Sequence, residues 1–458
     1  MAPTILTVLQ TLIVITALGG IKTQDMSSLG KLREVFAWKQ LTFNINGNIL
    51  TEDTSNIENI SDSRPRQFDT ILNEEFDPRR IWGKLPSKFN VETPTSTSRP
   101  AGGPDDFFIQ YNNVPMGVER VGDRVFVAIP RRRYGIPATL NVVDLNTDQR
   151  SPPLSPYPDL ERSRTLTSVY RTRADTCGRL WMVDTGLMEL PGNPQQVQPP
   201  AIVIYNLRTD RQILRYQFKS SDIPAANTPT GLASITVDIT SDCGDAYAYV
   251  PDLTTFGLIV FSLRQNDSWR LTHNYFNFNP LAGNLRVSGQ TFQWSDGIFS
   301  ITLSDPGTDG CRKAYFHPLV STQEFSVSTC LLKNNSASTE SNAWTLYHYE
   351  GDRGQNAQST MHGYHTPSGV IFYADIGRDA VSCWNTAAPL TANSVAVLAR
   401  HPTALSYPSD LHVTGDEVWV MANTLPRFGY STLDTNEYNF YVYSGNVKEL
   451  IAGTVCAK

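Results

Sequence analysis

The sequence contains few charged residues. Asp, Glu, Lys and Arg make up 18% of the 458 residues, aromatic residues reach 10%, and the formal net charge at pH 7 is -6. General nucleic-acid binding needs a basic surface, which this acidic balance does not supply. Low charge with abundant aromatics disfavours a coiled coil or a disordered chain and favours a β-rich core. We therefore expect a globular protein without a nucleic-acid partner.

The signature motifs of several enzyme classes are missing. The sequence has no G-x-S-x-G, no P-loop, no G-x-G-x-x-G and no H-E-x-x-H, so it lacks the usual marks of α/β-hydrolases, nucleotide-binding enzymes and zinc proteases. We expect no cofactor. Acid–base catalysis, or binding without catalysis, remains as the function.

Only one long apolar run occurs, between Ile5 and Leu18 at the start of the chain. It is too short for a comfortable membrane span, and the small residues Ala17 and Gly19 suit a nearby cleavage site. We interpret residues 1–22 as a secretory signal peptide, with an uncleaved anchor as the alternative. No later stretch is long enough to cross a bilayer, so we expect a soluble, secreted, extracellular protein.

An apolar strand, a tight polar turn and a second apolar or aromatic strand recur six times. GVERVGDRVFVAIP from Gly117 and DLHVTGDEVWVMAN from Asp410 are clear examples. The copies are spaced by roughly 50 to 70 residues, the scale of one propeller blade. We therefore predict an all-β fold over residues 35–456, a six-bladed β-propeller of four-stranded antiparallel sheets. The second strands are centred near Phe126, Trp181, Tyr247, Tyr315, Phe372 and Trp419.

The two ends of the chain are predicted to close the ring. Val35–Ile45 alternates apolar and polar residues, as a half-buried strand does. We expect it to pair with the C-terminal strand Asn439–Gly445, which leaves no open edge between the first and last blades. Between this strand and the first blade, residues 47–106 are rich in Asn, Ser, Thr and Pro, which predicts a long, partly mobile surface insertion.

Six cysteines in an exported chain indicate three disulfides. Equivalent turns of consecutive blades lie side by side, and positions facing each other across a hairpin can also be bridged. The blade register therefore favours the pairs Cys177 with Cys243, Cys311 with Cys330, and Cys383 with Cys456. The N-x-[ST] sequons predict glycosylation at Asn59, Asn266 and Asn334.

Propeller geometry also predicts where a ligand would bind. The start of each inner strand and the end of each second strand lie at the same end of a blade, so their loops converge on one mouth of the channel. The second strands end near Arg131–Arg133, Asp184, Asp252, His317, Asp375 and Asn423. The inner strands start near Glu119, Asp296, His362 and Asp410. This mixture suits a small polar or zwitterionic ligand.

Each of these candidates also has a structural interpretation. An Asp that follows a strand often binds only its own turn, and a run such as Arg131–Arg133 is often a solvated loop. His362 and His365 have the H-x-x-H spacing of some metal sites. On a strand, however, that spacing does not align the two side chains, and no third ligand is evident. We expect no metal site.

Several long segments resemble the insect Yellow and major royal jelly proteins. The resemblance rests on VPMGVERVGDRVFVAIPRRRYGIPATLNVVDL, CGRLWMVDTG, DAYAYVPD, FQWSDGIFSITLS, YPSDLHV and VWVMANTLPRF, and it extends from Val35 to Cys456. It implies a secreted six-bladed propeller that acts in cuticle and melanin pigmentation. Some Yellow members resemble dopachrome-conversion enzymes, others bind biogenic amines in the channel, and royal jelly members are nutritive.

Two functional hypotheses follow, both with a small catechol- or indole-type molecule as the partner. In the first, the protein isomerises dopachrome-like aminochromes, with His362 as the base and Glu119, Asp184 or Asp410 orienting it or sharing the proton. An arginine from Arg131–Arg133 holds the substrate carboxylate.

In the second hypothesis, the protein binds amines without catalysis. Phe428 and Tyr407 supply an aromatic wall, and Asp410 or Asp184 binds the ammonium group. A structural extracellular protein with a filled channel is a third possibility.

Overall fold

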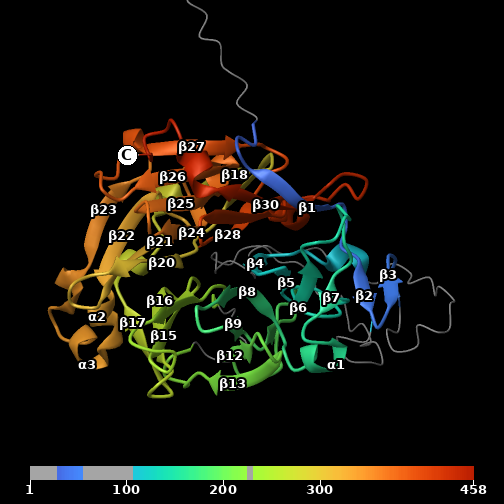
Figure 1. Ribbon diagram of the computed structural model, residues 1–458, viewed down its shortest axis with the longest axis horizontal. Coiled ribbons are helices and arrows are strands. Elements are labelled where there is room, and N and C mark those ends of the chain that lie inside the picture. Colours follow the sequence, from blue (N-terminus) through green and yellow to red (C-terminus); the bar gives the residue numbers. More distant parts are fainter. Residues whose placement is uncertain (1–27, 55–106, 224–230, 458) are drawn as a thin grey trace, which may run out of the picture.

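The structure, a computed structural model, describes residues 28–54, 107–223 and 231–457. Six four-stranded antiparallel sheets surround one centre, and the chain passes through them in order. In Figure 1 the colour runs round the ring from teal through green and yellow to red, and the blue strand β1 completes the red sheet. The predicted six-bladed β-propeller is confirmed.

Blades 1 to 3 each consist of four consecutive strands, apart from a small hairpin inserted in blade 2. Blade 1 contains β4 (Gly117–Val121), β5 (Arg124–Ala128), β6 (Leu140–Asp144) and β7 (Ser155–Pro156). Blade 2 contains β8 (Val169–Ala174), β9 (Arg179–Asp184), β12 (Ala201–Asn206) and β13 (Arg211–Gln217). Blade 3 contains β14 (Thr236–Ile239), β15 (Ala246–Asp252), β16 (Gly257–Ser262) and β17 (Asp267–Thr272).

Blades 4 and 5 follow the same order, whereas blade 6 takes its outer strand from the start of the chain. Blade 4 contains β20 (Ile298–Pro306), β21 (Arg312–Pro318), β22 (Gln323–Ser328) and β23 (His348–Asp352). Blade 5 contains β24 (Ser359–His365), β25 (Val370–Asp375), β26 (Ala380–Asn385) and β27 (Val395–Arg400). Blade 6 contains β28 (Pro408–Thr414), β29 (Glu417–Ala422), β30 (Phe440–Asn446) and β1 (Arg33–Trp38).

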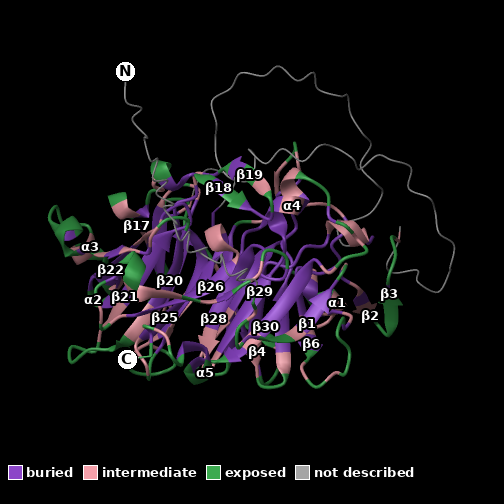
Figure 2. Ribbon diagram, turned by 90° about the horizontal axis from the view of Figure 1, so that it is seen from above, coloured by how far each residue is buried: buried purple, intermediate pink, exposed green. Residues whose placement is uncertain are grey.

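Short hairpins and helices lie outside the six four-stranded sheets. The hairpins are β2 (Phe43–Ile45) with β3 (Asn48–Leu50), β10 (Leu187–Met188) with β11 (Gln195–Gln196), and β18 (Asn284–Val287) with β19 (Gln290–Gln293). The α-helices are α1 (Leu160–Ser163), α2 (Thr329–Lys333), α3 (Asn335–Ser338), α4 (Leu425–Tyr430) and α5 (Val447–Ile451). Figure 2 shows β18, β19 and α4 at one end of the strands and α5 at the other. Within the described residues, every helix is too short or too polar to traverse a bilayer.

The strands form where β-branched and aromatic residues cluster, and they are buried on both faces because each blade lies between two others. All six residues of β9, β16, β25 and β26 are buried, and Figure 2 shows burial concentrated in the blades. Neighbouring inner strands approach closely at Gly117, where an added Cβ would lie 2.5 Å from the carbonyl oxygen of Tyr170. A larger residue would therefore push β4 away from β8 at the channel.

The ring closes by pairing of the N- and C-terminal strands, as predicted. β1 runs antiparallel to β30, with Arg33 opposite Ser444 and Trp38 opposite Phe440. The indole N–H of the buried Trp38 donates to the carbonyl oxygen of Pro152 at 2.8 Å. This bond joins β1 to the first blade. The start of the chain thereby completes the last sheet of the ring.

Three disulfides join the pairs of cysteines that the blade register favours. Cys177 bonds to Cys243, Cys311 to Cys330, and Cys383 to Cys456. Of the predicted glycosylation sites, Asn266 and Asn334 are exposed, and glycosylation there remains a prediction. The signal peptide, Asn59 and most of the 47–106 insertion lie outside the described residues.

Removing the Cys383–Cys456 bridge should cost more stability than removing Cys311–Cys330. The two bridges span 73 and 19 residues, and chain-entropy estimates give about 4 and about 3 kcal/mol respectively. Cys383 and Cys456 are also fully buried, so alanine there leaves a cavity in the core. Urea unfolding of the Cys383→Ala/Cys456→Ala and Cys311→Ala/Cys330→Ala proteins tests this order. Equal loss in both would show that loop length and burial do not set the contribution.

Candidate functional site

The predicted aspartates at second-strand ends bind nearby backbone and arginines. Asp184 accepts hydrogen bonds from the backbone N–H groups of Thr167 and Ser168 at 3.0 and 2.9 Å, and Arg215 donates to it at 2.9 Å. Asp252 accepts from the N–H of Thr254 at 3.2 Å. Both side chains are fully buried. These contacts fit the turn-binding interpretation and leave little carboxylate surface for a ligand.

Asp252 and Asp375 are each paired with an arginine three or more residues away. Arg270 donates to Asp252 at 3.0 Å. Arg378 and the hydroxyl of Ser382 donate to Asp375 at 3.2 and 2.8 Å. Burial raises the pKa of Asp375 to about 6, although Arg378 and Ser382 oppose this rise.

Other predicted rim residues also hold the protein together. Arg131 is buried and donates to backbone carbonyl oxygens, including those of Leu166 and Thr167 at 2.7 and 2.6 Å. The side-chain amide of Asn423 donates to the carbonyl oxygen of Pro115 at 2.7 Å. Phe428 is buried beneath the guanidinium of Arg133, 4.2 Å from the ring centre. This part of the mouth is therefore packed protein and not a solvated arginine loop.

Charged side chains from the inner strands of blades 6, 1 and 2 meet in the channel. Asp410 on β28 accepts from Arg173 on β8 at 2.7 Å and from the backbone N–H of Val118 on β4 at 3.0 Å. Arg173 also donates to Glu119 on β4 at 3.4 Å, and the ring of His412 lies 3.7 Å from Glu119. We call Glu119, Arg173, Asp410 and His412 the channel group. The structure thus brings together two of the four predicted catalytic residues, Glu119 and Asp410.

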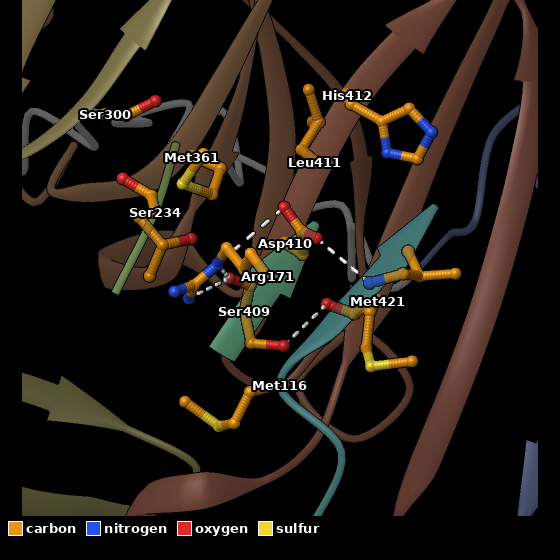
Figure 3. A network of polar contacts seen from close by, with 12 residues as sticks. Met116, Arg171, Ser234, Ser300, Met361, Ser409, Asp410, Leu411, His412 and Met421 are labelled. Carbon is orange, nitrogen blue, oxygen red and sulfur yellow. Dashed lines mark hydrogen bonds and ion pairs between the residues drawn. The ribbon is translucent and has the colours of Figure 1, made fainter. Parts of the chain in front are cut away.

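Arg171, two residues before Arg173, crosses the centre of the ring. Figure 3 shows its guanidinium between Ser409 and Asp410, with Met116, Met361 and Ser234 around it. It donates to the carbonyl oxygen of Ser409 at 2.6 Å and to that of Ala233 at 2.7 Å. Asp410 lies 3.8 Å away. One arginine therefore links blades 2, 3 and 6.

The channel group contains an acid and a neutral imidazole at neutral pH. Burial raises the pKa of Glu119 to about 8, even though Arg173 and the N–H of Ala174 oppose the rise. Burial and the adjacent Arg173 lower the pKa of His412 to about 3. Burial also acts to raise the pKa of Asp410, but Arg173 outweighs it and keeps the carboxyl ionised. A protonated carboxyl and an unprotonated imidazole can donate and accept a proton respectively.

A second polar cluster lies where the loops meet above the inner strands. Asp296, just before β20, is buried, and its Oδ2 atom has no hydrogen-bond partner among the described residues. Burial raises its pKa well above the usual range, and Arg132 opposes the rise. Asp296 also contributes to the raised pKa values of Tyr407 and Tyr430, so the three groups are neighbours. We call Asp296, Tyr407, Tyr430 and Trp294 the mouth group.

Aromatic rings form one wall of the mouth group. Trp294 meets Tyr407 edge to face at 5.8 Å, and its indole N–H donates to the hydroxyl of Tyr430 at 2.6 Å. Phe292 stacks on Tyr430 at 4.8 Å. Tyr407, predicted as part of an aromatic wall, does belong to one, but its carboxylate neighbour is Asp296 instead of Asp410 or Asp184. Phe428 stacks instead near Tyr111, at 5.6 Å.

His362 and His317 meet between blades 4 and 5. His362 lies 3.1 Å from Glu324, which is also 3.2 Å from His317 and 2.7 Å from Arg353. Ser300 contacts the other ring nitrogen of His362 at 2.7 Å. No hydrogen bond or ion pair between described residues joins His362 to Glu119, Asp184 or Asp410. His365 points elsewhere, to Asp416 at 3.0 Å, so the H-x-x-H pair does not converge.

Sequence reasoning missed Arg171, Arg173, His412 and Glu324. A signal existed for the first three. Charged or ionisable residues alternate along two otherwise apolar inner strands, as Arg171 and Arg173 on β8 and as Asp410 and His412 on β28. Alternate residues on a strand share one face, so each pair was predictable as a polar face. Glu324 had no comparable signal, because its partners His317, Arg353 and His362 all lie outside its own strand β22.

Comparison with known proteins shows which family the chain resembles. A family model described as "Major royal jelly protein" matches residues 167–456. L-dopachrome tautomerase yellow-f of Drosophila melanogaster is 44% identical over 359 residues, which cover 76% of this chain and 83% of that protein. Dopaminechrome tautomerase of the same species is 36% identical over 364 residues, covering 76% and 78%. Protein yellow of that species is 37% identical over 363 residues, covering 76% and 65%.

A Glu119→Gln variant should lose part of the pH dependence of stability. The folded-state pKa of about 8 exceeds the ordinary 4.5, so between these values the folded chain keeps a proton that the unfolded chain releases. Stability from this group is therefore full below pH 4.5 and declines as the pH rises toward 8. Glu119 should account for a loss of about 2 kcal/mol in the wild type between about pH 6.5 and 8.

Urea unfolding across this range measures the effect, and the glutamine variant should show a flatter profile. The pKa of His412 is about 3, so its own contribution changes at lower pH and does not overlap. Identical slopes for the two proteins would contradict a protonated Glu119.

Proposed function

The chain belongs to the Yellow and major royal jelly protein family, and we propose that it is a tautomerase of aminochromes in the melanin pathway. Support comes from relatives named L-dopachrome tautomerase and dopaminechrome tautomerase and from the acid–base pair in the channel group. We further propose that the protein is secreted. The apolar run at Ile5–Leu18 and three disulfides support export to an oxidising compartment.

The reaction needs two successive proton transfers from carbon to oxygen and no redox partner. Two C–H bonds of a dopachrome-like aminochrome break in turn, one beside the carboxylate and one at the neighbouring ring CH₂ group, and a base takes each proton. The electron pairs move into the ring system, and each of the two quinone oxygens gains a proton to become a hydroxyl. The product is an isomeric dihydroxyindole that retains all atoms of the substrate. A base and an acid that reach the reacting atoms of one small planar molecule are sufficient for this chemistry.

The observation that carries the proposal is the pairing of protonated Glu119 with neutral His412 beside Arg173. Glu119 would donate to the quinone oxygen, and His412 would accept the carbon-bound proton. His412 has no hydrogen bond to either ring nitrogen among the described residues, so a lone pair is available. A bound substrate carboxylate would add negative charge near His412 and stabilise its protonated form.

Arg173 would set the preference for a carboxylated substrate. Its side chain is 14% exposed, whereas those of Glu119 and Asp410 are 4% and 0% exposed. It is therefore the member of this ion-pair network most open to solvent, and an incoming anion would meet it first. Asp410 holds it in place through two short contacts, at 2.7 and 3.3 Å. We propose that Asp410 is a positioning residue and that Arg173 binds the substrate carboxylate.

Replacing Glu119 by Gln or His412 by Gln should lower dopachrome turnover by about 10²- to 10⁴-fold. Each change removes one proton-transfer group but keeps the approximate shape of the side chain. Loss of the visible absorbance of dopachrome measures the rate. Because Glu119 acts as an acid, the wild-type rate should also fall as the pH rises above about 8.

Glu417→Gln is the matched control. Glu417 lies on β29 opposite Thr414, is 43% exposed and contacts Arg120 at 3.8 Å, outside the channel group. It should retain the wild-type rate. Near-normal turnover by both the Glu119 and His412 variants would rule out the channel group as the reaction site.

Amine binding without turnover is a second candidate function, and the mouth group favours it. A buried carboxyl with an unpaired oxygen stands beside aromatic rings that a cation or an aromatic ligand could contact. An ammonium group would favour the ionised form of Asp296, so binding would release a proton and strengthen with rising pH.

Asp296→Asn should weaken dopamine or serotonin binding by about tenfold or more, because the carboxylate that pairs with the ammonium is lost. Isothermal titration calorimetry measures the affinity, and Glu119→Gln serves as the control that should leave it unchanged. Tight amine binding by a wild-type protein that does not convert dopachrome would favour this second function. Equal amine affinity in the wild type and the Asp296 variant would exclude the mouth group.

A further inference from the structure

The buried group between blades 4 and 5 has the donor atoms of a metal site. His317 lies near the end of β21, Glu324 near the start of β22, and His362 on β24. All three side chains are completely buried, and their candidate ligand atoms lie within 4.8 Å of one another. Nδ1 of His317 is 3.2 Å from Glu324, and Nε2 of His362 is 3.1 Å from its other oxygen.

These facing atoms lack the hydrogen bonds that buried polar atoms normally make. His317 Nδ1, His362 Nε2 and Glu324 Oε1 have no hydrogen-bond partner among the described residues, and neither does the hydroxyl of Tyr373 beside them. Tyr373 stacks against His362 at 5.7 Å. An unsatisfied buried polar atom costs free energy. Several such atoms that converge on one point indicate that another atom belongs between them.

The hydrogen bond of His317 Nε2 determines whether the other ring nitrogen, Nδ1, carries a proton or a free lone pair. Its Nε2 lies 3.1 Å from the carbonyl oxygen of Thr360. A carbonyl can only accept, so this nitrogen carries the proton. In the neutral ring Nδ1 is then a bare lone pair, and it faces a carboxylate oxygen of Glu324. Two acceptors at this distance repel each other unless a cation lies between them.

Each candidate ligand is also oriented by a hydrogen-bonding partner on the side away from the proposed ion, as metal ligands generally are. Thr360 fixes His317, the hydroxyl of Ser300 contacts Nδ1 of His362 at 2.7 Å, and Arg353 donates to Glu324 at 2.7 Å. These contacts orient the three side chains toward the common centre. Supporting hydrogen bonds of this kind are typical of residues that bind a metal ion.

We propose that His317, His362 and the carboxylate of Glu324 bind a divalent transition-metal ion of the zinc class. Two imidazoles and one carboxylate form a donor set that Zn²⁺ prefers. Because the site is fully buried and spans two blades, the ion acts structurally by joining blade 4 to blade 5. As a possible metal ligand, His362 was paired in the sequence only with His365, whereas the structure places it beside Glu324 and His317 of the neighbouring blade.

Metal analysis of the full-length secreted protein tests this site. The purified wild type should contain about one zinc-class ion per chain after dialysis, and a strong chelator should lower its melting temperature. Added Zn²⁺ should restore that temperature, since an ion that binds only the folded chain stabilises it. Substitution with Co²⁺ should give visible d–d absorption typical of a nitrogen- and oxygen-ligated ion.

His317→Gln and Glu324→Gln should lose the ion, and His365→Gln is the matched control. His365 is a buried histidine on the same strand as His362 but contacts Asp416, so this variant should keep the metal and the chelator response. If the His317 and Glu324 variants do not fold, the wild-type titrations decide alone. Wild-type protein that contains no ion, gains no thermal stability from Zn²⁺ and ignores the chelator would overturn the site. That result would assign the cluster to a proton shared between His317 and Glu324.

Discussion

The carboxylate of Asp410 is the contact on which the centre of the propeller depends. It accepts from Val118 in blade 1 and from Arg173 in blade 2, although it belongs to blade 6. Removing one partner of a buried ion pair strands a charge away from water, which costs several kcal/mol. The three blades therefore cannot move apart independently. The same contact holds Arg173 next to Glu119, so the interaction that joins these three blades also assembles the channel group.

Closure at the outer edge makes this burial possible. β1 pairs with β30 and completes blade 6 from the opposite end of the chain, while the Cys383–Cys456 bridge holds the C-terminus to blade 5. An open ring would admit water to the inner strands. Water would stabilise the charged form of Glu119 and return its pKa toward the ordinary value. The raised pKa of Glu119 is thus a property of the closed ring and not of any single strand.

Polar residues occur in three kinds of place, and their roles differ accordingly. Those at second-strand ends, such as Asp184, bind local backbone and an arginine and shape the loops. Those on inner strands, such as Glu119 and His412, face the channel and form the proposed reaction site. Those between blades, such as Glu324, lie away from the loops at the strand ends and from the channel group. Relatives with one fold can therefore differ in activity when only a few residues in one of these places change.

The number of blades, the closing strands and the cysteine pairs could be predicted from the sequence, because each depends on a local period or on the register that this period imposes. Apolar alternation marks each strand, and polar turns mark each hairpin. The acidic residues at strand ends were also visible, but their partners were not. Asp184 and Asp410 look alike in sequence, each at the edge of an apolar strand.

The folded structure was needed to show that Asp184 binds its own loop, whereas Asp410 contacts arginines from another blade. It likewise placed His362 against Glu324 and His317 instead of Glu119. The physical reason is that hydrogen bonding and pKa depend on which side chains approach within a few ångströms. In a ring of blades those neighbours come from strands tens to hundreds of residues apart, and no local pattern encodes them.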